Sequence, residues 1–474
     1  MVGESIPVET DIVVIGAGPG GYVAAIRAAQ SGFDVALVEK DAYGGTCLNV
    51  GCIPSKALIA AADITHDATH AEHMGIQAEL DVDFSRMVGW KNDVVKQLTG
   101  GVEKLCTANG VTLIDGTATF TSETEVQITR NGTNLGSIAF THAVIATGSR
   151  PVELPEFPFD GEYVLSSTHA LGLESLPERL LVVGAGYIGM ELSTVFAKLG
   201  VDVTVVEMLD QVLPGYERDI ARVVRKRAES LGINFHFGEG ARGWEATGRG
   251  VRVFTESDDA DRSEYEADRV VVAVGREPVT DTINLGAAGI ETDDRGFIPT
   301  DKQTRTVAER IFAVGDVVGE PLLAHKASKE GEIAADVIAG EAATFDSRAI
   351  PAAVFTDPEI CTVGMTEAEA EAENAGLDPV VGRMPMRASG RALTFGETDG
   401  FVRIVANGSS GTVLGAQLVC PDASELAAEL ALAIETEATL EDIATTVHTH
   451  PTLTEAVMEA AANARGEAVH TLNN

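Results

Sequence analysis

The chain is poor in positive charge. Only 34 of its 474 residues are lysine or arginine, against 72 aspartates and glutamates, so the formal net charge at pH 7 is −38. A surface field this negative excludes binding to nucleic acid or to an anionic membrane through general electrostatic attraction. Because the acidic residues are spread along the chain, we interpret them as a solvated surface adapted to high salt, where screening relieves self-repulsion. A docking surface for a basic partner is the alternative.

Long apolar runs and a leader segment are also missing. Residues 1–10 contain neither a basic segment nor an apolar one, and the longest apolar runs, such as residues 180–183, have the length of a strand. A bilayer span needs about 20 apolar residues, and a secretory signal needs a basic segment followed by an apolar one. We therefore expect a cytoplasmic protein that contacts no membrane.

Cysteine is scarce as well, with five in the chain. Cys106, Cys361 and Cys420 are isolated in sequence, and we expect each to pack as a small buried hydrophobe. Cys47 and Cys52 are only five positions apart. A persistent disulfide in the cytosol is usually catalytic rather than structural, so this pair is the candidate redox centre.

A strand, a glycine-rich turn and a helix, followed by a second strand, occur twice. Residues 11–38 contain the first copy and residues 180–206 the second. In each copy an apolar strand leads into a G-x-G-x-x-G pattern, whose glycines let the backbone approach a pyrophosphate at a helix N-terminus. The repeat predicts two dinucleotide-binding units. The glycines are Gly16, Gly18 and Gly21 in the first copy and Gly184, Gly186 and Gly189 in the second.

A glutamate ends the second strand of each copy. Glu39 lies 23 positions after Gly16, and Glu207 lies 23 positions after Gly184. A carboxylate at this place accepts hydrogen bonds from ribose hydroxyls and disfavours the 2′-phosphate of NADP. Since no arginine follows Glu207 before Arg218, the second copy is predicted to bind NAD rather than NADP.

Three further apolar strands, at residues 143–146, 270–274 and 311–314, fit the same α/β pattern. Ligands of open α/β sheets bind beyond the carboxyl ends of the strands, so the residues at these ends are candidate cofactor contacts. From residue 350 onward, strands and acidic helices without a glycine fingerprint predict a separate α+β domain. The candidate contacts are Thr147, Gly148, Gly275, Arg276, Gly315 and Asp316.

The cysteine pair lies in a glycine-rich run, G-G-T-C-L-N-V-G-C-I-P-S-K. Residues five apart do not face each other on a continuous helix, and a disulfide needs Cα atoms about 4.4–6.8 Å apart. We therefore expect a helix that is interrupted or begins here, with Pro54 in its first turn and its positive end next to the sulfurs. Two unconnected core cysteines are the alternative. Zinc is not expected, because no further ligands follow at a suitable spacing.

The C-terminal run H-T-H-P-T-L-T-E, residues 448–455, completes a set of motifs that spans essentially the whole chain. Together these motifs resemble the pyridine nucleotide–disulfide oxidoreductases. The resemblance implies two Rossmann-like domains, for FAD and NAD, and a C-terminal α+β dimerisation domain. The implied boundaries are 1–149 for the FAD domain with the redox disulfide, 150–276 for the NAD domain, 277–348 for a central domain that completes the FAD site, and 349–474 for the interface domain.

The resemblance also implies roles around the cofactors. FAD would contact Glu39 at its adenosine ribose and Asp316 at its ribityl chain, and NAD would contact Glu207 at its ribose. Lys56, paired with Glu191, would lie near the flavin. Taken alone, Lys56 and Glu191 are ordinary helix residues.

For the chemistry, the resemblance implies that Cys47 exchanges with the substrate and that Cys52 is the charge-transfer thiol next to the flavin. His450, oriented by Glu455, would take the substrate's proton, because thiol–disulfide exchange needs a thiolate. This histidine would serve the disulfide of the other subunit, so a homodimer is implied. The implied reaction oxidises a dihydrolipoyl group on an acyltransferase or another lipoyl protein and reduces NAD⁺. Other disulfide reductases of the family, and a flavoprotein scaffold, are the alternatives.

Overall fold

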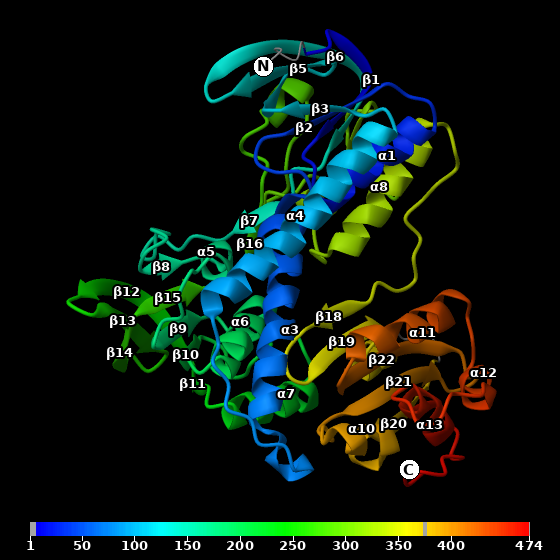
Figure 1. Ribbon diagram of the computed structural model, residues 1–474. Coiled ribbons are helices and arrows are strands. Elements are labelled where there is room, and N and C mark those ends of the chain that lie inside the picture. Colours follow the sequence, from blue (N-terminus) through cyan, green and yellow to red (C-terminus); the bar gives the residue numbers. More distant parts are fainter. Residues whose placement is uncertain (1–5, 373–376, 474) are drawn as a thin grey trace.

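The computed structural model describes residues 6–372 and 377–473. Figure 1 shows one sheet at the top, a second at the lower left and a third at the lower right. Two long helices, α3 (Cys52–Thr69) and α4 (Phe84–Ala108), run down the centre between them. The predicted arrangement of two dinucleotide-binding folds and a C-terminal α+β domain is confirmed.

The first sheet contains the first glycine fingerprint. Its central strand, β1, pairs in parallel with β2 and β6, and the paired segments 13–15, 36–38 and 143–145 are apolar. Helix α1 (Pro19–Gln30) follows β1 and packs on α8 (Ala324–Ile338). In spatial order the strands are β3 (Thr112–Asp115), β2 (Val35–Glu39), β1 (Glu9–Ile15), β6 (Thr133–Ile145), β5 (Glu125–Arg130) and β4 (Thr117–Ser122), with β17 (Ile311–Ala313) also paired to β6.

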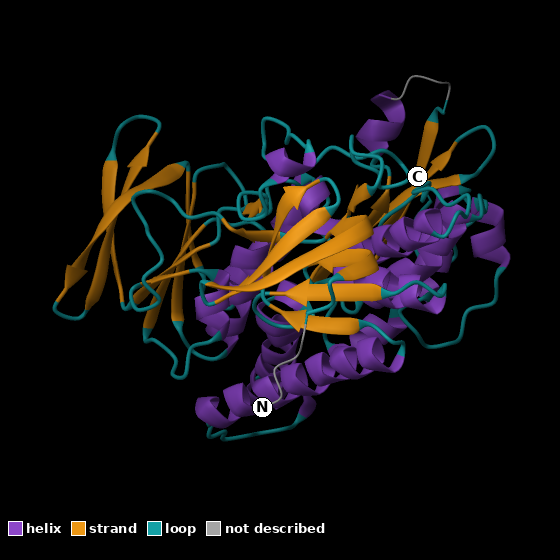
Figure 2. Cartoon of the chain, turned by 90° about the horizontal axis from the view of Figure 1, so that it is seen from above, coloured by secondary structure: helices purple, strands orange, loops and turns teal. Residues whose placement is uncertain are grey.

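The second sheet repeats this plan around the second fingerprint. Helix α6 (Tyr187–Lys198) follows the central strand β9, and α7 (Arg218–Ser230) leads to the edge strand. An antiparallel ribbon of β12 (Glu239–Thr247), β13 (Gly250–Ser257) and β14 (Arg262–Ala267) projects at the left of Figure 2. In spatial order the sheet strands are β11 (Asn234–Phe237), β10 (Asp202–Glu207), β9 (Arg179–Val183), β15 (Arg269–Val272) and β8 (Val164–Leu165).

The third sheet is antiparallel and carries its own core. Apolar faces of β21 and β22 meet α11 (Ala423–Glu435) and α13 (Glu455–Ala464). Shorter helices lie at its edges: α9 (Glu367–Ala372), α10 (Gly390–Phe395) and α12 (Leu440–Thr445). The strand order is β18 (Ala352–Val354), β19 (Glu359–Gly364), β22 (Val413–Cys420), β21 (Phe401–Asn407) and β20 (Pro379–Pro385).

One stretch, Gly45–Thr69, is apolar and long enough to cross a bilayer by composition, with mean hydropathy 1.3. The expectation of no membrane contact rested on uninterrupted apolar runs, and polar residues interrupt this stretch. In the structure this stretch is broken at Gly51 and lies between α4 and α6, with Lys56 and Asp63 in ion pairs to α6. Within the described chain, 28% of its most apolar window is buried, and the two ion pairs fix the stretch to α6.

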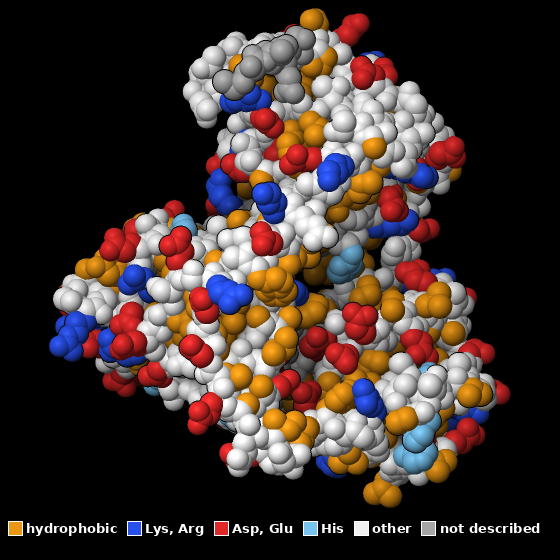
Figure 3. Space-filling view, viewed as in Figure 1, with side chains coloured by type: hydrophobic (Ala, Val, Ile, Leu, Met, Phe, Trp, Pro, Cys, Tyr) orange, Lys and Arg blue, Asp and Glu red, His pale blue; other side chains and the backbone are white. Residues whose placement is uncertain are grey.

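Acidic side chains cover the surface rather than gathering in one patch, as Figure 3 shows for one face. Low salt lengthens the range of their repulsion. We therefore expect the melting temperature to fall by several degrees or more between molar and millimolar KCl. Thermal scans across that range, with sucrose as an uncharged control, measure the effect. Equal melting at all KCl concentrations would mean that the charge does not affect stability.

Candidate active site

The two glycine-rich turns have the same geometry. Gly16 and Gly184 have φ angles of +99° and +103°, and a Cβ on them would lie 2.4 Å and 2.6 Å from a carbonyl oxygen of an adjacent segment. A Cβ on Gly21 or Gly189 would lie 1.9 Å or 2.0 Å from the carbonyl oxygen of the first glycine in its turn. Both helices therefore approach their strands more closely than any side chain would permit.

The middle glycines face open space. A Cβ on Gly18 or Gly186 would meet no atom of the described residues within 4 Å. Packing therefore does not require glycine here, whereas a ligand that touches the backbone does. Gly18 and Gly186 are the N-caps of α1 and α6, where free N–H groups and the helix dipole favour a negative group. Each turn fits the pyrophosphate of a dinucleotide.

The two strand-end glutamates make matching contacts. Glu39 accepts hydrogen bonds from the N–H groups of Ala17 at 2.7 Å and Asp41 at 2.8 Å. Glu207 accepts them from Ala185 at 2.7 Å and Leu209 at 2.9 Å. Each carboxylate is thus held beside its glycine turn with lone pairs left for ribose hydroxyls.

Gly186→Ala tests the second turn. The methyl group would enter ligand space without touching the protein, so we expect NADH binding to weaken by about 1–3 kcal/mol, roughly 10- to 100-fold. FAD content and the melting temperature without NAD should stay unchanged. Gly100→Ala, inside α4 and equally free of neighbours, is the control and should leave NADH binding intact. NADH titration of both variants measures the difference, and unchanged affinity in Gly186→Ala would remove NAD from this turn.

The cysteine pair lies at a break between two helices. Cys47 is in α2 (Gly45–Val50), Cys52 is the first residue of α3, and Gly51 between them has φ −134° and ψ −112°. The expected interruption of the helix is confirmed. A Cβ on Gly45 would lie 2.5 Å from Gly18 Cα, so α2 begins directly on the first glycine turn and places the dithiol beside it.

The two thiols differ in acidity. A hydrogen bond from the Cys47 thiol, with the ammonium of Lys56, lowers the pKa of Cys52 to about 7. The same hydrogen bond, together with burial, raises the pKa of Cys47 above its ordinary value. Of the two thiols, Cys52, at the N-terminus of α3, is therefore the one that more readily forms a thiolate.

The other three cysteines are buried, as predicted. Burial raises the pKa of Cys106 to about 11 and that of Cys361 to about 12. Burial also raises the pKa of Cys420. Thiols of this kind are unreactive, which leaves Cys47 and Cys52 as the candidates for redox chemistry.

Lys56 and Glu191 meet across the interface of α3 and α6. The ammonium lies 2.8 Å from the carboxylate, whose side chain is 6% exposed. Glu191 also accepts hydrogen bonds from Ser55 Oγ at 3.2 Å and from the N–H of Phe355 at 2.9 Å. A buried carboxylate with this many donors is held in one position.

The remaining candidate residues meet where strands end. Arg276 donates to Ser149 Oγ at 2.8 Å, and the Ser149 hydroxyl donates to Asp316 at 2.5 Å. Thr147 donates to the carbonyl of Val279 at 2.6 Å. Ser149 begins the short strand β7 (Ser149–Pro151), which pairs with β16 (Arg276–Pro278).

Glycines bend the chain at these same ends. Gly148, Gly275 and Gly315 have φ angles of +70°, +142° and +80°. The strand expected at residues 270–274 ends at Val272, because the chain turns through Gly275 into β16.

His450 and Glu455 form a hydrogen-bonded pair on the third domain. His450 Nδ1 lies 2.8 Å from Glu455 Oε1, and Glu455 Oε2 accepts from the N–H of Thr452 at 2.9 Å. Burial raises the pKa of Glu455, but the hydrogen bonds from Thr452 and His450 outweigh burial and hold this pKa below its usual range. The imidazole is 78% exposed, so its Nε2 is open to a group from outside this chain.

His448, two positions before His450, is buried, and its Nε2 lies 3.0 Å from Glu429. Sequence reasoning missed three residues that hold the predicted ones: Ser55, Ser149 and Phe355. Ser55 adjoins Lys56 and could have been suspected from that. Ser149 and Phe355 carry no motif, since only the fold brings their segments to the site.

Comparison with known proteins extends over the whole chain. Residues 10–331 match the pyridine nucleotide-disulphide oxidoreductase family, and residues 350–461 match its dimerisation domain. Proteins named dihydrolipoyl dehydrogenase from Haloferax volcanii and Bacillus subtilis are 64% and 48% identical, covering 100% and 99% of each chain.

Solved structures agree. LpdA from Mycobacterium tuberculosis has a TM-score of 0.89 at 30% identity, covering 95% of this chain and 99% of its own. The flavoprotein disulfide reductase RclA from Escherichia coli has a TM-score of 0.84 at 29% identity, with coverage of 95% and 99%. FAD and NAD are the cofactors of the dihydrolipoyl dehydrogenases, and both glycine turns of this chain fit a dinucleotide. The dimerisation domain indicates a homodimer. The chain belongs to the pyridine nucleotide-disulphide oxidoreductases, the flavoprotein disulfide oxidoreductases whose motifs its sequence carries.

Proposed function

We propose that this protein is a dihydrolipoyl dehydrogenase, which oxidises a protein-bound dihydrolipoyl group to the lipoyl disulfide and reduces NAD⁺ to NADH. The observation that carries the proposal is the dithiol at the helix break, beside the first glycine turn, with a low thiol pKa on Cys52. The full-length identity of 64% to a protein of this name supports the choice of substrate.

In this proposal the chain's own residues move the proton and the sulfur bonds. His450, held by Glu455, takes a proton from one substrate thiol, and the resulting thiolate attacks Cys47 of the oxidised Cys47–Cys52 pair. A mixed disulfide forms and Cys52 leaves as a thiolate, stabilised by Lys56 and by the N-terminus of α3. The second substrate sulfur then displaces Cys47. When bound, FAD and NAD supply the two-electron and hydride chemistry that reoxidises the dithiol.

The 78% exposure of His450 supports a role in trans. On one protomer the imidazole faces solvent, and none of the described hydrogen bonds joins it to the dithiol segment. Its partner in catalysis is therefore proposed to be the dithiol of the second subunit in the homodimer.

The proposal also assigns each domain to a cofactor or to the subunit interface. Residues 1–149 and 277–348 hold FAD, residues 150–276 hold NAD, and residues 349–474 form the subunit interface. The pairing of β17 with β6 supports joining the first two segments. The lipoyl group comes from an acyltransferase or another lipoyl protein in the cytoplasm.

The test is a substrate-specific assay. The yellow protein is purified in molar KCl, and reduction of NAD⁺ by dihydrolipoamide is recorded, with NADP⁺ and glutathione as controls. We expect rapid turnover with dihydrolipoamide and NAD⁺ only. Turnover of another thiol with no dihydrolipoamide activity would overturn the substrate assignment and the role of His450.

A further inference from the structure

Helices α3 and α6 are joined by two ion pairs. In the inner pair, Lys56 contacts Glu191 at 2.8 Å. In the outer pair, Asp63 contacts Lys198 at 2.7 Å. Asp63 lies seven residues after Lys56, and Lys198 lies seven residues after Glu191. A seven-residue step is about two helical turns and returns to the same helix face, so both pairs lie along one seam with their charges reversed.

The loop between β18 and β19 contacts both pairs. The N–H of Phe355 donates to Glu191 at 2.9 Å, and its ring centre lies 4.4 Å from Lys56 Nζ. Two residues later, Asp357 contacts Lys198 at 2.7 Å. The inner and outer pairs are therefore bound by one short segment of the third domain.

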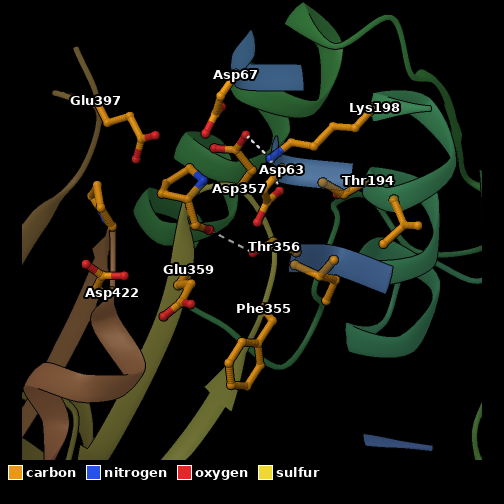
Figure 4. A pocket seen from close by; sticks show the side chains of 14 residues that line it. Asp63, Asp67, Thr194, Lys198, Phe355, Thr356, Asp357, Glu359, Glu397 and Asp422 are labelled. Atoms are coloured by element: carbon orange, nitrogen blue, oxygen red, sulfur yellow. Dashed lines mark hydrogen bonds and ion pairs between the residues drawn. The ribbon is translucent and has the colours of Figure 1, made fainter. Parts of the chain in front are cut away.

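Lys198 is the buried centre of the outer pair. Its side chain is 6% exposed, compared with 13% for Asp357 and 40% for Asp63. Figure 4 shows its ammonium between these two carboxylates, on the wall of a cavity of about 170 Å³. Lys198 is the only lysine or arginine among the residues that line the cavity, and the carboxylates there are Asp63, Asp67, Asp357, Glu359, Glu397 and Asp422.

We propose that Lys198 is a positioning residue for the dithiol: it holds Asp63 and Asp357 together and thereby keeps α3, α6 and the 355–357 loop in the register that places Lys56 and Glu191 beside Cys52. No motif marks Lys198 in the sequence. The inference rests on the proposed function only in taking Cys52 as the redox thiol.

The physical consequence of losing Lys198 follows from charge. Asp63 and Asp357 would face each other without a shared cation, and like charges in a partly buried site repel strongly. Asp357 keeps Arg227 at 2.9 Å, and that guanidinium also lies 3.5 Å from His66 Nε2 on α3. Asp63 loses its printed cation partner, Lys198, so we expect the part of α3 around Asp63 to shift relative to the loop. Phe355 then shifts from Glu191 and Lys56. Because Lys56 is the cation that acts on the Cys52 thiolate, the disturbance reaches the sulfur.

The test measures thiol acidity rather than turnover. The FAD-loaded dimer is reduced, the reductant is removed, and alkylation of Cys47 and Cys52 by iodoacetamide is followed against pH by peptide mass spectrometry. In Lys198→Met the apparent pKa should rise by about one unit, so that alkylation at pH 6.5 slows roughly five- to tenfold. Lys198→Arg should restore the original profile. Asp63→Asn, a milder variant, should shift the profile less and in the same direction.

Lys91→Met is the matched control. Lys91 is 4% exposed, and its ammonium donates to the carbonyl of Leu171 at 2.6 Å, joining α4 to α5 (Ser167–Leu171) through a neutral acceptor rather than through the charges of the two ion pairs. The Lys91→Met substitution should lower the melting temperature of the protein while leaving the pH profile of cysteine alkylation unchanged. An unchanged profile in Lys198→Met, or an equal shift in Lys91→Met, would overturn the proposal. Since no substrate is turned over, failure of the lipoyl activity is a separate result.

Discussion

Replacing Cys52 by serine is expected to lower dihydrolipoamide turnover by about 10⁴-fold or more, the scale found when one member of a catalytic set is removed. Serine cannot form the disulfide with Cys47, so the substrate thiolate has no disulfide bond to attack and no thiolate can leave from position 52. FAD should remain bound, because the first glycine turn and Glu39 do not depend on this sulfur. Turnover and FAD content, measured on the same preparation, test the prediction.

Cys106→Ala provides the control for this substitution. Cys106 is 0% exposed, and burial raises its pKa to about 11, so its loss should leave turnover intact at a modest cost in stability. Turnover retained in Cys52→Ser would refute the redox assignment. A parallel loss of FAD and turnover would mean that Cys52 supports the fold.

His450→Gln is expected to lower dihydrolipoamide turnover about 10²- to 10⁴-fold at neutral pH, the usual contribution of a general base. Glutamine cannot take the substrate's proton. The remaining rate should therefore rise with pH toward the ordinary thiol pKa of about 8.5, where solvent supplies the thiolate. A pH–rate profile with FAD content at each point measures both effects.

The chain offers a close control for His450. His470 Nδ1 lies 2.7 Å from Glu459, one helical turn beyond Glu455 on α13, and its side chain is 66% exposed. His470→Gln removes a similar imidazole–carboxylate pair, so it should cost far less activity. Equal losses in both variants, or loss of FAD in His450→Gln, would indicate a structural role for the pair.

Local patterns predicted the two dinucleotide-binding units. Apolar segments followed by G-x-G-x-x-G gave β1 with α1 and β9 with α6, because a buried parallel strand and a glycine turn leave few alternatives. The five-residue spacing of Cys47 and Cys52 predicted a helix that is interrupted or begins there, and the structure has the break at Gly51. The C-terminal domain was predicted in outline only, since it carries no glycine fingerprint that would fix the order of its strands and helices.

Contacts between distant segments could not be predicted. Ser149 joins Arg276 to Asp316, and Phe355 joins Glu191 to Lys56. These partners come from different parts of the chain, and neither periodicity nor spacing reports such distances. The composition of Gly45–Thr69 likewise satisfies a bilayer span, and only the structure shows that it is broken at Gly51 and packs against α4 and α6.

The sequence by itself determined the chemistry that this protein has available: two dinucleotide turns, two adjacent thiols, a histidine–glutamate pair and a strongly negative surface. Those features depend only on residue types and on short spacings, and both can be read directly from the sequence. The tertiary structure decided which thiol is acidic and what holds it. The pKa of Cys52 depends on a hydrogen bond from Cys47 and on Lys56, and Lys56 is held by Glu191, 135 residues away. Electrostatic effects of this kind act through space over a few ångströms, so they exist only once the chain has folded.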